Sequence, residues 1–111
     1  IAQGTYVRQT GQLTTLADNT SSATTIFTVS TDVAKAFNVN YTIVRDTAVR
    51  TGVLSVTSKT TGPVYSDDYN ESDDTGVTLT VTQSSSTVSV KYTTSSTGFD
   101  AQLTYSITHL A

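Results

Sequence analysis

The side chains that could carry out chemistry are few, and the first is the single histidine. A serine nucleophile needs a base that accepts its proton and a third group that orients this base. The chain has 14 Ser but one His, His109, which lies two residues from the end of the sequence, and it has no Gly-x-Ser-x-Gly motif. His109 could act as a base only if the tail folded back into a site. We therefore predict no catalytic triad and interpret His109 as an exposed tail residue.

Carboxylates are the second candidate group. Glycoside hydrolysis uses a pair of them, but the acids here are mostly Asp in predicted turns, and no Trp is present to stack on a sugar ring. Five of the nine acids lie in the segment from Asp67 to Asp74: Asp67, Asp68, Glu71, Asp73 and Asp74. Such a segment could supply oxygen ligands to calcium, although the EF-hand spacing is missing, or it could be a solvated loop that discourages strand pairing. We assign no catalytic, cofactor-binding or metal-binding residue.

The six tyrosines are the remaining candidates. Tyr41, Tyr92 and Tyr105 are in phase with apolar neighbours and are expected in the core. Tyr65 and Tyr69 flank the acidic pair 67–68 near a predicted loop. Tyrosine among hydroxyl side chains is typical of adaptable binding surfaces, so these two residues are predicted to contribute to a recognition surface.

The composition predicts the kind of element that positions these residues. Of 111 residues, 39 are Ser or Thr, and the chain has 13 Val against one Glu, three Lys and six Leu. β-Branched residues favour strands and disfavour helices. A helical bundle, a coiled coil and an α/β nucleotide-binding domain are therefore excluded. With no Cys, disulfide scaffolds and thiolate metal sites are excluded as well.

Apolar residues alternate with polar ones through most of the chain, which is the pattern of half-buried strands. The predicted strands cover 22–30, 37–43, 49–58, 64–69, 77–82, 87–92 and 101–108, with a short additional strand near 5–9. Seven or eight strands joined by turns predict an all-β antiparallel sandwich or jelly roll. The predicted core consists of Phe37, Val39, Tyr41, Ile43, Val77, Leu79, Val81, Val88, Val90, Leu103, Tyr105 and Ile107.

Three segments lack this clear pattern. Residues 1–20 alternate poorly and are interpreted as an extended N-terminal arm or linker, followed by a sandwich domain over 21–111. Around Gly52, the strand 49–58 is expected to be buried on both faces or bulged. Residues 70–75 are expected to form an acidic loop. Because the sequence starts at Ile1, we expect it to be a fragment of a longer polypeptide or a processed product.

The net charge of the chain limits the kinds of partner that it can bind. The net charge is −3, the isoelectric point is about 4.7, and no run of Lys or Arg is present. Such a surface repels phosphates, so a nucleic-acid partner is excluded. The longest apolar runs are two or three residues, so no membrane insertion is expected.

The amino-acid sequences of several predicted strands resemble those of small β-sandwich domains in tailed-bacteriophage virion proteins. The similar segments are 36–45, 50–56, 65–69 with 76–77, 92–94, 97–98 and 103–107. The resemblance implies a non-enzymatic structural domain of the virion, usually trimeric, on a tail fibre or appendage that attaches to the host. Its implied partners are other virion proteins and a glycan or protein on the host surface. A capsid decoration protein and a bacterial adhesin or carbohydrate-binding module remain as alternatives.

Overall fold

The computed structural model describes residues 7–110, and within this range every regular element is a β-strand. No helix that could cross a membrane occurs in this part of the chain. The strands are β1 (Val7–Leu16), β2 (Thr24–Ser30), β3 (Ala36–Arg45), β4 (Ala48–Thr57), β5 (Val64–Glu71), β6 (Val77–Ser84), β7 (Thr87–Thr94) and β8 (Ala101–His109).

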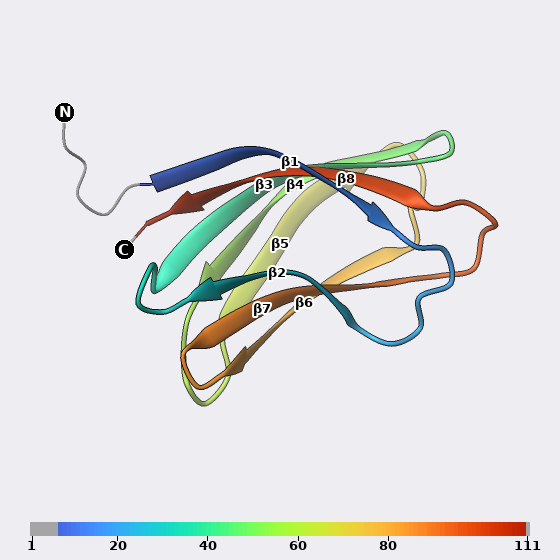
Figure 1. The fold of residues 1–111 in the computed structure, drawn as a ribbon. Helices are drawn as coiled ribbons and strands as arrows, with labels where there is room; N and C mark the ends of the chain where they lie inside the picture. Colours follow the sequence, from blue (N-terminus) through green and yellow to red (C-terminus); the bar gives the residue numbers. More distant parts are fainter. Residues whose placement is uncertain (1–6, 111) are drawn as a thin grey trace.

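The strands form two antiparallel sheets that pack face to face (Figure 1). One sheet has five strands in the order β1-β8-β3-β4-β5, and the other has three in the order β2-β7-β6. The connections β1–β2, β3–β4, β5–β6 and β7–β8 gather at one end of the sandwich, on the right of Figure 1. This architecture confirms the predicted all-β antiparallel sandwich.

The core lies between the two sheets and follows the predicted alternation. Eleven of the twelve predicted core residues are buried, and Tyr105 is partly buried. Tyr105 stacks on Phe27 of the edge strand β2, with ring centroids 5.1 Å apart. Because one side of this stack lies at the sheet edge, the ring is less enclosed than the other core side chains.

Strand β1 differs from the arm expected for residues 1–20. Its residues pair with β8, with Leu16 opposite Ala101, and the pairing shifts between Gln9 and Gln12. Gly11 lies in this bulge and has φ of 72°, a conformation that suits glycine. The extra residue breaks the period-2 pattern, which is why alternation alone did not indicate a strand here. The predicted strand near 5–9 overlaps β1, and its first two residues lie outside the described range.

The expectation for β4 is also corrected. The pairing of β4 with β3 and with β5 runs without interruption through Gly52, so no bulge occurs there. Leu54 and Val56 are fully buried, whereas Val49 and Val53 on the other face are 42% and 38% exposed. The strand is therefore buried on one face only.

The burial of Leu16 yields a test of whether β1 belongs to the fold. Leu16 is 0% exposed and Leu13, on the outer face of the same strand, is 69% exposed. We expect Leu16→Ala to lower the free energy of unfolding by about 2–5 kcal/mol, because the truncation removes core contacts and leaves a cavity. Leu13→Ala should change it by less than about 0.5 kcal/mol. Urea denaturation of both variants measures this, and equal small effects would contradict a structural role for β1.

Candidate functional site

A shallow, open hollow of about 890 Å³ lies on the outer face of the five-stranded sheet. We call it the outer groove. Its lining follows two neighbouring rows of residues that lie opposite one another across β8, β3, β4 and β5. The rows are Ser106, Asn40, Val53 and Asp68, and next to it Thr104, Thr42, Thr51 and Asn70.

The middle of the groove is made of threonine hydroxyls. Thr51 donates a hydrogen bond from Oγ1 to the carbonyl oxygen of Tyr41 at 3.2 Å, and the hydroxyls of Thr42 and Thr51 are 3.5 Å apart. Beside them on β3, and on β5 at one margin, the exposed side chains of Asn40, Asp68 and Asn70 make no hydrogen bond within the described residues. These polar groups are therefore available to a ligand.

Gly52 determines how closely β5 approaches β4 beside the groove. It lies opposite Tyr69 in the register. A Cβ atom at position 52 would come within 2.5 Å of the Tyr69 Cβ and 2.6 Å of the Asp68 carbonyl oxygen. A side chain at this position would push β5 away from β4 and displace Asp68 from the groove.

On the inner face of β4, directly behind this region, Arg50 is buried with 3% exposure. Its Nη2 forms an ion pair with the Asp67 carboxylate, its Nε donates to the Tyr41 hydroxyl at 3.0 Å, and its Nη1 donates to the Val77 carbonyl at 2.6 Å. The Tyr69 ring covers the guanidinium, whose carbon is 3.7 Å from the ring centroid. The buried charge is thus compensated on every side, as low-dielectric surroundings require.

Tyr41 and Asp67 complete this network. The Tyr41 hydroxyl donates to Asp67 Oδ1 at 2.6 Å. Burial, together with this bond to a carboxylate, raises the pKa of Tyr41 well above its usual value. The tyrosine therefore stays a neutral donor, and Asp67 is held between two partners on the inner side of β5.

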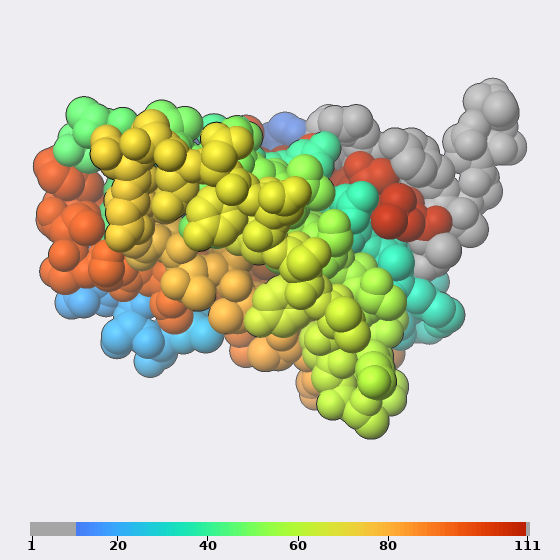
Figure 2. Space-filling view, turned by 180° about the vertical axis from the view of Figure 1, so that it is seen from behind, coloured from blue at the N-terminus to red at the C-terminus, as the bar shows by residue number. Residues whose placement is uncertain are grey.

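Alternation along β5 gives its two adjacent acids different roles. Asp67 points toward the interior and is bound to Arg50, whereas Asp68 points to the outer face and lines the groove. Figure 2 shows β5, in yellow, uncovered along its length, in agreement with its exposed burial pattern.

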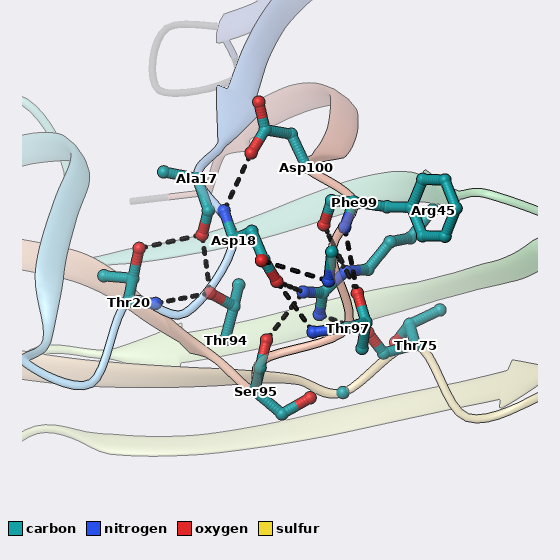
Figure 3. Close-up of polar contacts among 12 residues, drawn as sticks. Ala17, Asp18, Thr20, Arg45, Thr75, Thr94, Ser95, Thr97, Phe99 and Asp100 are labelled. Atoms are coloured by element: carbon teal, nitrogen blue, oxygen red, sulfur yellow. Dashed lines mark hydrogen bonds and ion pairs between the residues drawn. The ribbon is translucent and has the colours of Figure 1, made fainter.

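A second buried arginine, Arg45, joins the loops at the end of the sandwich (Figure 3). It donates from Nε to the Phe99 carbonyl at 2.8 Å, from Nη1 to the Thr75 carbonyl at 2.9 Å and from Nη2 to the Ser95 carbonyl at 2.6 Å. Its Nη2 also contacts the carboxylate of Asp18 at 2.6 Å. One side chain thus connects the β1–β2, β5–β6 and β7–β8 loops.

Asp18 is held from the opposite side by backbone groups. The N–H groups of Thr97 and Gly98 donate to its carboxylate at 2.9 and 3.1 Å. The bond from Thr97, with those from Gly98 and Arg45, lowers the pKa of Asp18 below its usual value. The charged form is therefore the one that stabilises this loop cluster.

The acids from Asp67 to Asp74 do not form one cluster: Asp67 and Glu71 both pair with Arg50, whereas Asp68 faces the outer side of the sheet. Glu71 accepts bonds from the backbone and hydroxyl of Thr75, and Asp74 accepts one from the backbone of Gly76. Among the described residues, no group of three or more His, Asp or Glu side chains is placed to hold a metal ion. The predicted loop 70–75 is also shorter than expected, because β5 extends to Glu71.

His109 is not an exposed tail residue as predicted. It is the last residue of β8 and is partly buried, in a hollow that Phe27, Tyr105 and Ile107 also line. Among the described residues, its Nδ1 is buried without a hydrogen-bond partner. Within this part of the chain, no group orients the ring as a catalytic base requires.

The two tyrosines predicted for a recognition surface have different surroundings. Tyr65 and Tyr69 are 40% and 46% exposed. Tyr69 borders the outer groove and also covers Arg50, while Tyr65 lies outside the groove. Sequence reasoning missed Arg45 and Arg50, although both lie two or four positions from core residues on their strands. This spacing places both side chains on the inner face of their strands, and it is the signal in the sequence that could have identified them.

Comparison with known proteins finds a distant structural similarity. No protein family model and no curated protein matches the chain. Among solved structures, the chain is similar to the tailspike protein of Acinetobacter baumannii phage AM24, with a TM-score of 0.48 and 11% identity over 94% of this chain. The match covers 26% of the tailspike chain, so this chain spans about a quarter of that protein's length. A similarity at this level carries no information about function.

The Arg50–Asp67 pair predicts unequal roles for the two adjacent acids of β5. Asp67→Asn removes the nearer of two counter-charges of the buried Arg50 guanidinium and leaves the Glu71 carboxylate, 4.0 Å from Nη1. We expect the free energy of unfolding to fall by about 3 kcal/mol. Asp68→Asn, one residue away on the exposed face, should change it by less than about 0.5 kcal/mol. Chemical denaturation at neutral pH compares the two variants. Similar free energies of unfolding for both variants would contradict the stabilising role of the Arg50–Asp67 pair.

The lowered pKa of Asp18 predicts a stability difference that depends on pH. A carboxyl group with a lower pKa in the folded state stabilises the fold above its unfolded pKa and loses this effect as pH falls through the folded value. We expect Asp18→Asn to be less stable than the unmodified protein at pH 7, with the difference shrinking as pH falls below about 4. Thermal unfolding across this range measures it, with Asp32→Asn as an exposed control. A difference that does not vary with pH would show that the charge has no role.

Proposed function

We propose that this chain is a non-enzymatic structural domain of a phage particle, carried on a tail fibre or appendage, that helps to attach the particle to its host. The observation that carries the proposal is the outer groove. It presents polar side chains without hydrogen-bond partners among the described residues, on a sheet that the Arg50 network stabilises from its inner face. The resemblance of the strand sequences to those of virion β-sandwich domains supports the same function. The absence of Cys and Met and the small number of charges suit a durable extracellular assembly.

The absence of catalysis is part of this proposal. Glycoside hydrolysis needs two carboxyl groups placed about 5–10 Å apart on either side of the bond that is cleaved. Asp68 is the only acidic residue among the described residues that line the groove, and no histidine accompanies it. The groove is therefore suited to binding and lacks a second group for acid–base chemistry.

We further propose that the domain works as a homotrimer in contact with other virion proteins. The low charge density allows identical surfaces to approach closely. A small domain without disulfides also gains apparent stability from assembly. The localisation that follows is the extracellular particle.

Labelling of intact particles tests this function. An antibody against the chain, carried on gold and applied to purified particles of the phage that encodes it, should mark the tail fibres or the baseplate appendages. A reconstruction of the marked structure should show three copies around an axis. Gold over the head would instead favour a capsid decoration protein, and particles without any label would contradict the proposal.

A further inference from the structure

We propose that the outer groove is a binding site for a short chain of neutral sugars. This inference rests on the proposed function in host attachment and specifies the class of ligand that the groove recognises. Four properties of the groove support it: its shape, its hydrogen-bonding groups, its charge and its rigidity.

The shape suits a linear ligand that lies across the strands. The two rows of lining residues cross four strands, from β8 to β5. Since neighbouring strands lie about 4.8 Å apart, each row is roughly 14 Å long. An open groove of this length accommodates a few sugar units in extended form and leaves both ends of the chain free to continue.

The hydrogen-bonding groups match the hydroxyls of sugars. Asn40 and Asn70 each offer a donor and an acceptor, the hydroxyls of Thr104 and Ser106 can do both, and the Asp68 carboxylate accepts only. A sugar hydroxyl is both donor and acceptor, so it can pair with all of these groups. Between them, Val53 is 38% exposed and gives the C–H surface of a sugar ring an apolar contact.

The charge of the groove selects against acidic ligands. Asp68 carries a negative charge, and the described lining contains no Lys or Arg. A uronic acid, a sialic acid or a phosphate group would meet a like charge without a compensating cation. A neutral glycan can donate hydroxyl protons to the Asp68 carboxylate, and charge-assisted bonds of this kind are the stronger ones.

The groove is also preformed. The network of Arg50, Asp67 and Tyr41 fixes β5 and β4 from the inner side, and Gly52 allows their close approach. A rigid surface avoids the entropic cost of ordering on binding. The chain has no Trp, and the two rows of described residues that line the groove contain no aromatic residue, so we expect weak binding per domain. A trimer that presents three such grooves would raise the overall avidity.

Glycan arrays measure the specificity directly. The full chain would be tested, as a purified protein and on multivalent beads, against oligomers of neutral hexoses and their uronic-acid and sialylated counterparts. Positive signals would be followed by NMR titration with the same oligosaccharide. We expect binding to neutral members only, with chemical-shift changes at Thr42, Thr51 and Asp68.

Two pairs of variants separate the groove from the rest of the surface. Asp68→Asn and Asn40→Ala should each weaken binding roughly tenfold, since each removes a polar partner of the sugar. The matched controls are Asp73→Asn, an exposed acid in the β5–β6 loop, and Asn38→Ala, on the same face of β3 but outside the groove. These controls should bind as the unmodified protein does. Thermal unfolding of all four variants confirms that the fold is intact.

Each other outcome overturns the inference in a recognisable way. Preferential binding of acidic glycans contradicts the charge argument, and neutral binding that survives both groove variants places the site elsewhere. No binding to any glycan, with gold labelling still on the tail, removes the inference but leaves the attachment function. Groove variants that dissociate the oligomer in light scattering, without an effect on glycans, would assign the groove to contacts between copies of the chain.

Discussion

The structure depends on the burial of two guanidinium groups inside a small β-sandwich. Arg45 and Arg50 are each 3% exposed, at positions where strand alternation directs side chains inward. A buried charge is tolerated only with counter-charges and acceptors around it. Each arginine therefore determines the position of chain segments that are distant in sequence: Arg50 fixes β5 through Asp67, and Arg45 fixes three loops through Asp18 and backbone carbonyls.

The fixed position of β5 connects this interior chemistry to the outer surface. β5 is an edge strand of the five-stranded sheet, and none of its residues is buried. Its attachment relies on its ladder with β4, on the Arg50–Asp67 pair and on the Tyr69 ring over Arg50. Since successive residues face opposite sides, the same strand that holds Asp67 inside must present Asp68 outside. The groove on the outer face is thus a consequence of the network on the inner face.

The sequence was sufficient for those features that depend on local periodicity. Alternation located seven strands and eleven buried core residues, because the side chains of a half-buried strand repeat every two residues. It failed at β1, where the bulge at Gly11 interrupts the period, and at Gly52, where glycine serves close strand approach in an unbulged strand. It also passed over Arg45 and Arg50, because charged residues are rarely assigned to a core even when they are in phase.

The outer groove could not be predicted in the same way, because it is made by the registers of four strands. Asn40 and Asp68 are 28 positions apart, and nothing local in the sequence indicates that Val53 lies between them in one row. Once the register is known, however, the different roles of the inner and outer positions follow. Inner positions carry the constraints of packing and buried charge, whereas outer positions such as Asn40, Asp68 and Ser106 have no partner within the described fold. Substitutions at these outer positions can therefore change the chemistry of the groove with little effect on stability, which is the property that the proposed recognition surface requires.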